Sequence, residues 1–190
     1  MPENNSIQIS SVYGPVSSWR LGRSLGIDLN LIDSICSFRC IYCQLGKINR
    51  PTSERGLFVS TEKVIADLQR IDYDLVDCIT ISGTGEPTLA INLGEVIEAI
   101  KKLTGLPVVV LTNSTLLFNQ DVRDSLAMAD KVFCKLDAAT ERSFRLVDRP
   151  VEGVSLQMVL DGIRAFRQEY DGFHGALRAA FVAGVGYQEQ

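Results

Sequence analysis

Residues Pro107 to Asn113 read PVVVLTN, and this stretch decides the fold class. It is apolar and largely β-branched, without the alternation of polar and apolar residues that marks a strand with one face in water. Such a run is typical of a strand covered on both faces, which is the usual situation in a parallel sheet. The stretch therefore predicts an α/β fold with helices packed on the sheet.

Strand-like and helix-like segments alternate on both sides of this stretch. Further strands are predicted over residues 24–32, 77–83, 131–137 and 176–185. Helices are predicted from Ser60 or Thr61 to about residue 71, over 93–103 up to Gly105 and Pro107, over 121–129, and from about 155 to 166. Short connections between these strands predict a parallel sheet that is either doubly wound or curved into part of a barrel.

The composition indicates one globular domain in a reducing compartment. The chain has 190 residues, 46% of them hydrophobic, which is enough for one sizeable core. A net charge of −4 argues against nucleic-acid binding by the surface as a whole, although a local basic patch stays open. We expect neither a signal peptide nor a membrane span, because no apolar run has the required length and flanks. Five cysteines, three of them crowded together, favour metal-binding or reactive thiols in the cytoplasm over secreted disulfides.

Unusual residues follow four of the predicted strands. They are a cysteine loop after the first strand, GTGEPT (83–88) after the second, TNS (112–114) after the third and LDAAT (136–140) after the fourth. The carboxyl ends of parallel strands meet at one edge of a sheet, where chemistry gathers in such folds. We therefore expect the functional site at this edge.

The cysteine loop CSFRCIYCQLG (36–46) places Cys36, Cys40 and Cys43 in the spacing C-x3-C-x2-C. Thiolates bind soft metals, and a CxxC pair can chelate one centre. A [4Fe-4S] cluster usually takes four cysteines, so three would leave one iron open to another ligand. The spacing thus permits a metal centre with an open position.

Structural zinc is the alternative that the spacing leaves open. Zinc needs four ligands, and Cys78, Cys134 or His174 would have to supply the last one. Both remaining cysteines lie in apolar strands, where cysteine more readily acts as a small core residue. His174 is expected in a surface loop. A non-catalytic zinc or iron–sulfur protein therefore stays as the second hypothesis.

The sequence CSFRCIYC, with Tyr42 just before the third cysteine, resembles the signature of the radical S-adenosylmethionine (SAM) superfamily. The resemblance implies that Cys36, Cys40 and Cys43 hold a [4Fe-4S] cluster and that SAM binds the fourth iron. It implies reductive cleavage of SAM to a 5′-deoxyadenosyl radical, which abstracts hydrogen from a substrate. It also implies a partial (β/α) barrel and an electron donor such as flavodoxin or ferredoxin.

The motifs at the other strand ends then resemble the family's SAM-binding positions. GTGEPT resembles the motif that holds the methionine part of SAM, which makes Gly83, Thr84, Gly85 and Glu86 candidates, although Thr84 stands where a glycine is usual. The alternative is a turn in which Glu86 only caps the next element.

Two further pairs are cofactor-binding candidates by the same resemblance. Thr112 and Asn113 would shape the SAM pocket, or would simply form a turn. Lys135 and Asp137 should face the same side of their strand and would meet SAM, or would form a structural ion pair. Arg20 and Arg23, ahead of the first strand, could each hold a carboxylate or phosphate, but we favour solvated surface positions for both.

A longer run of motifs, from YGPVSSWRLGRSLGID at residue 13 to the dipeptide RP at 149–150, resembles a narrower subgroup. The subgroup is the iron–sulfur oxidoreductases related to wyosine-tRNA synthases. This resemblance makes RNA one substrate option, which the acidic net charge disfavours. The hydrogen donor is therefore kept as an unknown substrate.

The end of the chain matches this family poorly. We expect residues 1–23 to form a polar extension that can hold a short strand around Val12 and Tyr13. Residues 24–190 would form a partial barrel of about five strands, cut short at its C-terminal end, with Gly184 and Gly186 serving a last SAM-contacting turn. An inactive fragment of a radical SAM enzyme is thus a further alternative.

Overall fold

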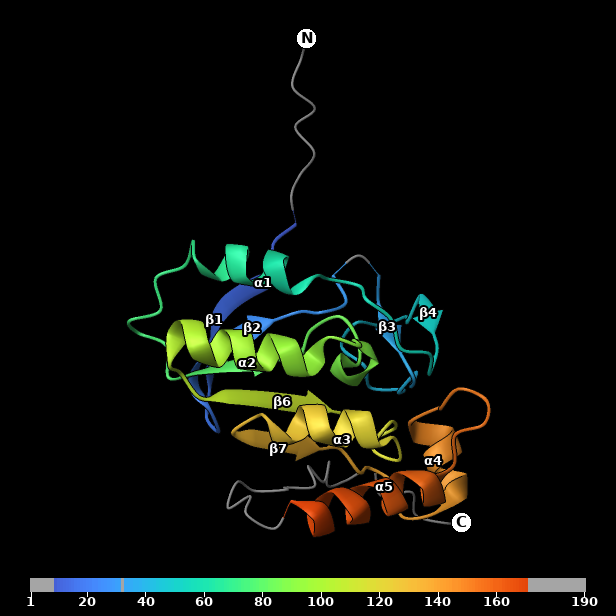
Figure 1. Ribbon diagram of the computed structural model, residues 1–190. Helices are drawn as coiled ribbons and strands as arrows, with labels where there is room; N and C mark the ends of the chain where they lie inside the picture. Colours follow the sequence, from blue (N-terminus) through green and yellow to red (C-terminus); the bar gives the residue numbers. More distant parts are fainter. Residues whose placement is uncertain (1–8, 32, 171–190) are drawn as a thin grey trace.

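The main sheet has five strands in the order β1-β2-β5-β6-β7, in a computed structural model that describes residues 9–31 and 33–170. The strands are β1 (Val12–Ser18), β2 (Gly22–Ile27), β5 (Cys78–Ile81), β6 (Val108–Thr112) and β7 (Lys131–Cys134). The last four are parallel and adjacent in chain order, whereas β1 pairs antiparallel with β2 (Figure 1). The predicted parallel sheet is confirmed, and the order of its strands is that of a barrel segment rather than a doubly wound sheet.

The fifth strand differs from the one expected. β1 forms a hairpin with β2 in which Ser18 lies opposite Gly22, so a strand does form around Val12 and Tyr13 and it completes the sheet. The predicted strand 176–185 lies outside the described residues, as do Gly184 and Gly186. The division of the chain at residue 23 stays a prediction, and the hairpin crosses it.

Four helices lie side by side on one face of the sheet (Figure 1). They are α1 (Thr61–Leu68), α2 (Leu93–Thr104), α3 (Gln120–Ala127) and α5 (Leu156–Glu169). Local signals set their ends, because the side chains of Ser60 and Ser155 cap α1 and α5, and Gly105 ends α2 in the left-handed conformation at φ 65°. Within residues 9–31 and 33–170 no helix packs on the other face of the sheet, as in the wall of a barrel.

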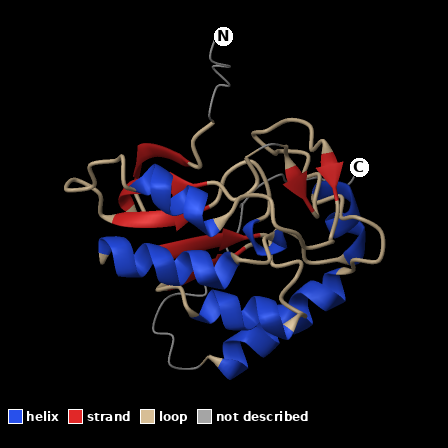
Figure 2. Cartoon of the chain, turned by 45° about the horizontal axis from the view of Figure 1, so that its top comes forward, coloured by secondary structure: helices blue, strands red, loops and turns tan. Residues whose placement is uncertain are grey.

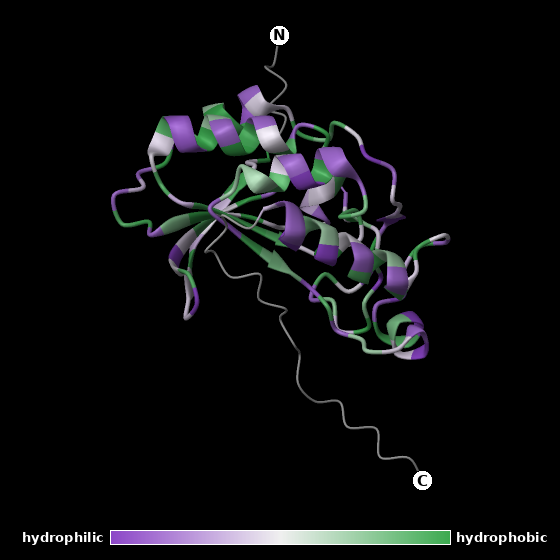
Figure 3. Cartoon of the chain, turned by 60° about the horizontal axis from the view of Figure 1, so that its bottom comes forward, coloured by the Kyte–Doolittle hydropathy of each residue, from purple (hydrophilic) through white to green (hydrophobic). Residues whose placement is uncertain are grey.

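The core lies between these helices and the sheet. Helix α2 buries Leu93, Val96, Ile97 and Ile100 against it, and its opposite side is polar (Figure 3). On the other face of the sheet Leu111 is 38% exposed, although it lies within a strand of otherwise buried residues. The face without helices is therefore where a cavity can form.

Several short elements were not predicted. They are β3 (Ile35–Cys36), β4 (Arg50–Pro51), the 3-10 helix η1 (Pro87–Leu89) and helix α4 (Glu141–Val147). Figure 2 shows β3 and β4 apart from the main sheet, beyond the carboxyl ends of its strands. Helix α4 buries only Phe144, so its sequence has no apolar stripe by which it could be recognised.

The first predicted strand is also shorter than expected. It ends at Ile27, because the Asp28 carboxylate accepts hydrogen bonds from the backbone N–H groups of Asn30 and Thr84 and turns the chain. Within the described residues no helix is long and apolar enough to cross a membrane.

Candidate active site at the carboxyl edge of the sheet

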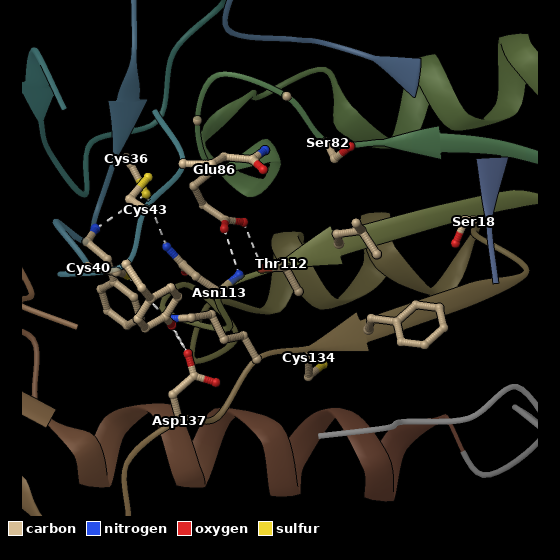
Figure 4. Close-up of a pocket in the computed structure, with 18 of the residues that line it drawn as sticks. Ser18, Cys36, Cys40, Cys43, Ser82, Glu86, Thr112, Asn113, Cys134 and Asp137 are labelled. Atoms are coloured by element: carbon tan, nitrogen blue, oxygen red, sulfur yellow. Dashed lines mark hydrogen bonds and ion pairs between the residues drawn. The ribbon is translucent and has the colours of Figure 1, made fainter. Parts of the chain in front are cut away.

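A cavity of about 500 Å³ opens at the carboxyl edge of the sheet and continues along its uncovered face. Eleven of the twelve predicted site residues line it, namely Cys36, Cys40, Tyr42, Cys43, Gly83, Gly85, Glu86, Thr112, Asn113, Lys135 and Asp137. Thr84 does not. Its hydroxyl donates to the Asn30 carbonyl, 3.2 Å away. Figure 4 shows the cysteines at one end of this cavity and Ser18 at the other.

The cysteine loop starts at the end of β3 and packs on helix α4. Phe38 is 3% exposed and meets Phe144 edge to face, with ring centroids 5.4 Å apart. The Ile41 N–H donates to the Val147 carbonyl at 2.9 Å. The loop is therefore held by side-chain and backbone contacts before any metal binds.

Burial keeps two of the thiols neutral. It raises the pKa of Cys36 to about 12, with the Glu86 carboxylate acting in the same direction. It raises the pKa of Cys40 to about 11, opposed by the nearby Lys135 ammonium. Because metals bind thiolates, occupation of this site must displace protons from the thiols.

The three thiols line one cavity from a single loop. Ligands on one tetrahedral zinc lie about 4 Å apart, since each Zn–S bond is about 2.3 Å. Across residues 9–31 and 33–170, no three His, Cys, Asp or Glu side chains are grouped to hold one metal ion. An iron–sulfur cluster spreads its cysteines over different irons, and three cysteines lining one cavity suit that demand.

The turn at 83–86 is built for a close backbone approach. A Cβ on Gly85 would lie 2.0 Å from the Ile35 carbonyl oxygen, so only glycine fits there. Gly83 has φ +137°, and a Cβ there would meet the Asp28 carboxylate. The Glu86 N–H donates to the same Ile35 carbonyl at 2.9 Å. Gly85 thus admits the backbone of β3 at Ile35, the residue that precedes the cysteine loop.

Glu86 connects the ends of β5 and β6. Its carboxylate is 2% exposed and accepts hydrogen bonds from the Thr88 N–H and hydroxyl, the Thr112 hydroxyl at 2.7 Å and the Asn113 N–H at 2.7 Å (Figure 4). Burial raises the pKa of this carboxyl, and the hydrogen bonds oppose that shift. It also caps η1, which was the alternative interpretation of this residue. Direct contact between Glu86 and SAM stays a prediction.

Asn113 carries this network to the cysteine loop. Its amide nitrogen donates to the Ser37 hydroxyl at 2.8 Å and to the Cys36 sulfur at 3.5 Å. The residue therefore orients a predicted cluster ligand, in addition to lining the cavity.

Lys135 and Asp137 form the ion pair that was considered as an alternative. The Lys135 ammonium lies 3.0 Å from Asp137, 2.5 Å from Asp148 and 3.3 Å from the Cys40 sulfur. Asp137 accepts a hydrogen bond from the Tyr42 hydroxyl, and burial together with Asp148 raises its pKa to about 6. Its second oxygen is buried without a partner. The pair thus leaves one acceptor that a ligand hydroxyl could satisfy.

Sequence reasoning missed Asp148, whereas the surface position expected for Arg20 is confirmed. Asp148 is 1% exposed and follows helix α4, which had no sequence signal. Arg20 is exposed, as expected of a surface residue, and it also lines the cavity, with its guanidinium 5.1 Å from the Trp19 ring centroid. Arg23 is exposed and pairs with Asp77 at 3.7 Å.

Cys78 and Cys134 were predicted to be core residues, and His174 was predicted to lie in a surface loop. Cys78 and Cys134 are buried, 5% and 1% exposed, as expected of core residues, and burial raises the pKa of Cys134 to about 12. Cys134 also lines the cavity. His174 lies outside the described residues.

Comparison with known proteins identifies relatives of this architecture. The model of the radical SAM superfamily matches residues 32–177. A UPF0026 protein of Synechocystis is 49% identical over 162 residues, covering 85% of this chain and 61% of the relative. A UPF0026 protein of Methanocaldococcus jannaschii is 36% identical over 164 residues, covering 84% and 50%. A GTP 3′,8-cyclase of Haemophilus ducreyi is 32% identical over 143 residues, covering 73% and 40%.

A solved structure shares the fold. SuiB of Streptococcus suis bound to S-adenosylmethionine superimposes with a TM-score of 0.52 at 16% identity, covering 75% of this chain and 29% of SuiB. The chain spans about half to three-fifths of the length of the UPF0026 proteins that it matches.

Proposed function

This chain belongs to the radical SAM superfamily, whose cofactors are a [4Fe-4S] cluster and SAM, and we propose that it is an oxidoreductase of that superfamily acting in the cytoplasm. Cys36, Cys40 and Cys43 would hold the cluster, whose chemistry would be the one-electron reductive cleavage of SAM to methionine and a 5′-deoxyadenosyl radical. The observation that carries the proposal is the convergence of three cysteines and the 83–86 turn on one cavity.

Different residues around the cavity would bind different parts of the two cofactors. Cys36, Cys40 and Cys43 would hold three irons. The 83–86 turn lines the cavity beside them and would receive the methionine part of SAM through its backbone groups. The carboxylate oxygen of Asp137 that has no partner would accept a hydrogen bond from the ribose of SAM, since ribose hydroxyls are hydrogen-bond donors.

The substrate would occupy the rest of the cavity. That part extends along the uncovered face of the sheet, where Leu111 and Phe133 line it. Apolar walls exclude water from a radical and favour an organic hydrogen donor. RNA is one option for the whole protein, and the net charge of −4 does not favour it.

The test is anaerobic reconstitution with iron and sulfide, followed by an assay of SAM cleavage with dithionite. Wild type is expected to show the brown absorbance of a [4Fe-4S] cluster and to release 5′-deoxyadenosine. Cys36→Ala is expected to lose both signals, because it removes a predicted ligand. The matched control is Cys78→Ala, which removes a buried thiol outside the cavity and should keep both.

Two outcomes contradict the proposal. One is a Cys36→Ala protein that still holds the cluster and cleaves SAM. The other is wild-type protein that carries stoichiometric zinc and takes up no iron, which is the result for a structural zinc site.

A further inference from the structure

A second concavity, of about 430 Å³, lies on the outside of the cysteine loop. It is lined by Arg39, Arg145, Arg149 and Pro150 and shares no residue with the catalytic cavity. Guanidinium groups that line one hollow favour an anion in it, because each is a permanent cation with several N–H donors. The feature therefore calls for a negatively charged partner, and we refer to Arg39, Arg145 and Arg149 as the arginine cluster.

Backbone hydrogen bonds and one left-handed residue fix the positions of Arg39 and Arg149. The Arg39 N–H donates to the carbonyls of Asp148 and Arg149, at 2.9 and 3.2 Å. Arg149 has φ +49°, a left-handed conformation that costs about 1 kcal/mol or more for a residue with a side chain. Strain of this kind persists where the surrounding structure imposes it. Here it accompanies the dipeptide at 149–150 that formed part of the family resemblance.

Two of the three charges have no internal counter-charge. Arg145 pairs with Glu141 at 2.7 Å. Neither Arg39 nor Arg149 has an ion-pair partner among the described residues, and both are exposed. Their charges are available to a ligand.

The surroundings strengthen this local charge. Residues 34–56 carry four cations, Arg39, Lys47, Arg50 and Arg55, against a single anion, Glu54, in a chain of net charge −4. The cysteine loop and its flanks therefore carry a local excess of positive charge in an acidic chain. Such an excess attracts a negatively charged macromolecule and speeds its association.

We propose that the arginine cluster docks an acidic one-electron carrier protein, which reduces the cluster that the cysteine loop would hold. This proposal rests on the function proposed above. In the step, the carrier loses one electron and the cluster gains it, and no atom is transferred.

The position of the surface favours a redox partner over a substrate. Arg39 directly precedes Cys40 in the chain. A protein bound to the arginine cluster would therefore lie next to a predicted ligand of the iron–sulfur cluster. By the function proposed above, SAM and substrate would occupy the catalytic cavity, which shares no lining residue with this concavity. A carrier that docks outside can therefore reach the cluster without entering the catalytic cavity.

Exposed apolar residues lie beside the arginines. Ile41 is 53% exposed and Leu146 is 60% exposed. Their segments run side by side, joined by the bond from Ile41 to Val147. Small interfaces with apolar residues and complementary charge are typical of transient redox complexes.

The experiment measures binding of an acidic flavodoxin to the full chain by calorimetry at low and high salt. Wild type is expected to bind, with affinity falling at least tenfold from 50 to 500 mM NaCl. The double variant Arg145→Gln/Arg149→Gln, and separately Arg39→Gln, should bind at least tenfold more weakly. Arg70→Gln is the matched control, since Arg70 is an exposed arginine just beyond α1, at the opposite edge of the sheet.

A second readout separates docking from catalysis. Reduced flavodoxin should reduce the reconstituted double variant at least tenfold more slowly than wild type, whereas dithionite, which needs no docking, should reduce both equally. Loss of SAM cleavage with dithionite in wild type would instead contradict the proposed function. Melting temperatures equal to wild type exclude misfolding of the variants.

Three results overturn the docking proposal. The first is failure of both flavodoxin and an acidic ferredoxin to bind wild type. The second is equal binding by wild type and the arginine variants. The third is unchanged carrier binding with lost affinity for pyrophosphate or a short RNA, which would make the arginine cluster a phosphate site.

Discussion

At the scale of single residues, the candidate site depends on a few contacts between segments distant in sequence. Gly85 admits the Ile35 carbonyl, and Glu86 receives donors from Thr112 and Asn113. Each contact joins the cysteine loop or the 83–86 turn to a neighbouring strand end. A small change at one of them should therefore disturb the placement of the thiols.

Gly85→Ala is expected to destabilise the protein and weaken cluster binding. Its methyl group would lie 2.0 Å from the Ile35 oxygen, a backbone atom that cannot turn aside. Overpacking of this kind costs about 1–3 kcal/mol. Urea unfolding gives the stability, and iron content after reconstitution gives the cluster binding.

Gly56→Ala is the control for this prediction. The nearest atoms to its Cβ belong to the Phe58 ring, at 3.2 Å, and a side chain can move. Equal losses in the two variants would show that the Ile35 contact is not the cause.

At the scale of elements, packing between helices fixes the wall behind the cavity. Arg123 on α3 is 8% exposed. It donates to the carbonyls of Leu117 and Phe118, at 2.8 and 3.0 Å, and to Glu169 on α5 at 2.7 Å. One side chain thus joins α3, α5 and the segment that follows β6.

Arg123→Met is expected to lower the free energy of unfolding by about 2 kcal/mol, because it leaves a buried carbonyl without a donor. Arg164→Met, on α5, removes an arginine that is 63% exposed and pairs only with Asp161. Its expected loss is about 0.5 kcal/mol or less. Urea titration of both variants tests the difference, and a larger loss for Arg164→Met would refute the assignment.

At the scale of the whole molecule, the cysteine loop lies between two hydrophobic cores. The larger core lies between the sheet and its helices. The smaller lies under the loop and includes Phe38, Phe144, Val154, Leu156 and Val159. A ligand that fixes the loop should therefore stabilise what packs against it more than it stabilises the distant helices.

Hydrogen exchange before and after reconstitution tests this coupling. Amides of α4 (141–147) and of the 83–86 turn are expected to exchange more slowly in the loaded protein, since both contact the cysteine loop. Amides of α1 serve as the internal reference, because that helix packs on α2 and β1. Equal protection throughout the described chain would argue for global stabilisation instead.

The sequence by itself determined the features that depend on neighbouring residues. The apolar run at 107–113 predicts a buried strand, Ser60 and Gly105 mark helix ends, and the spacing of the cysteines predicts a metal centre with an open position. The strand and the helix ends are confirmed, and the metal centre at these cysteines stays a prediction. All three could be inferred because caps, periodicity and ligand spacing act within a few residues.

Only the tertiary structure decided the features that join distant residues. It brought Asp148 to Lys135 and Cys40, gave Glu86 donors from Thr112 and Asn113, and set Arg39 beside Arg149. The sequence could not show these pairs. A single charged residue has no recurring spacing that identifies its partner, and its role depends on the residues that pack against it. The physical reason is that a buried charge must find its partner wherever the fold supplies one.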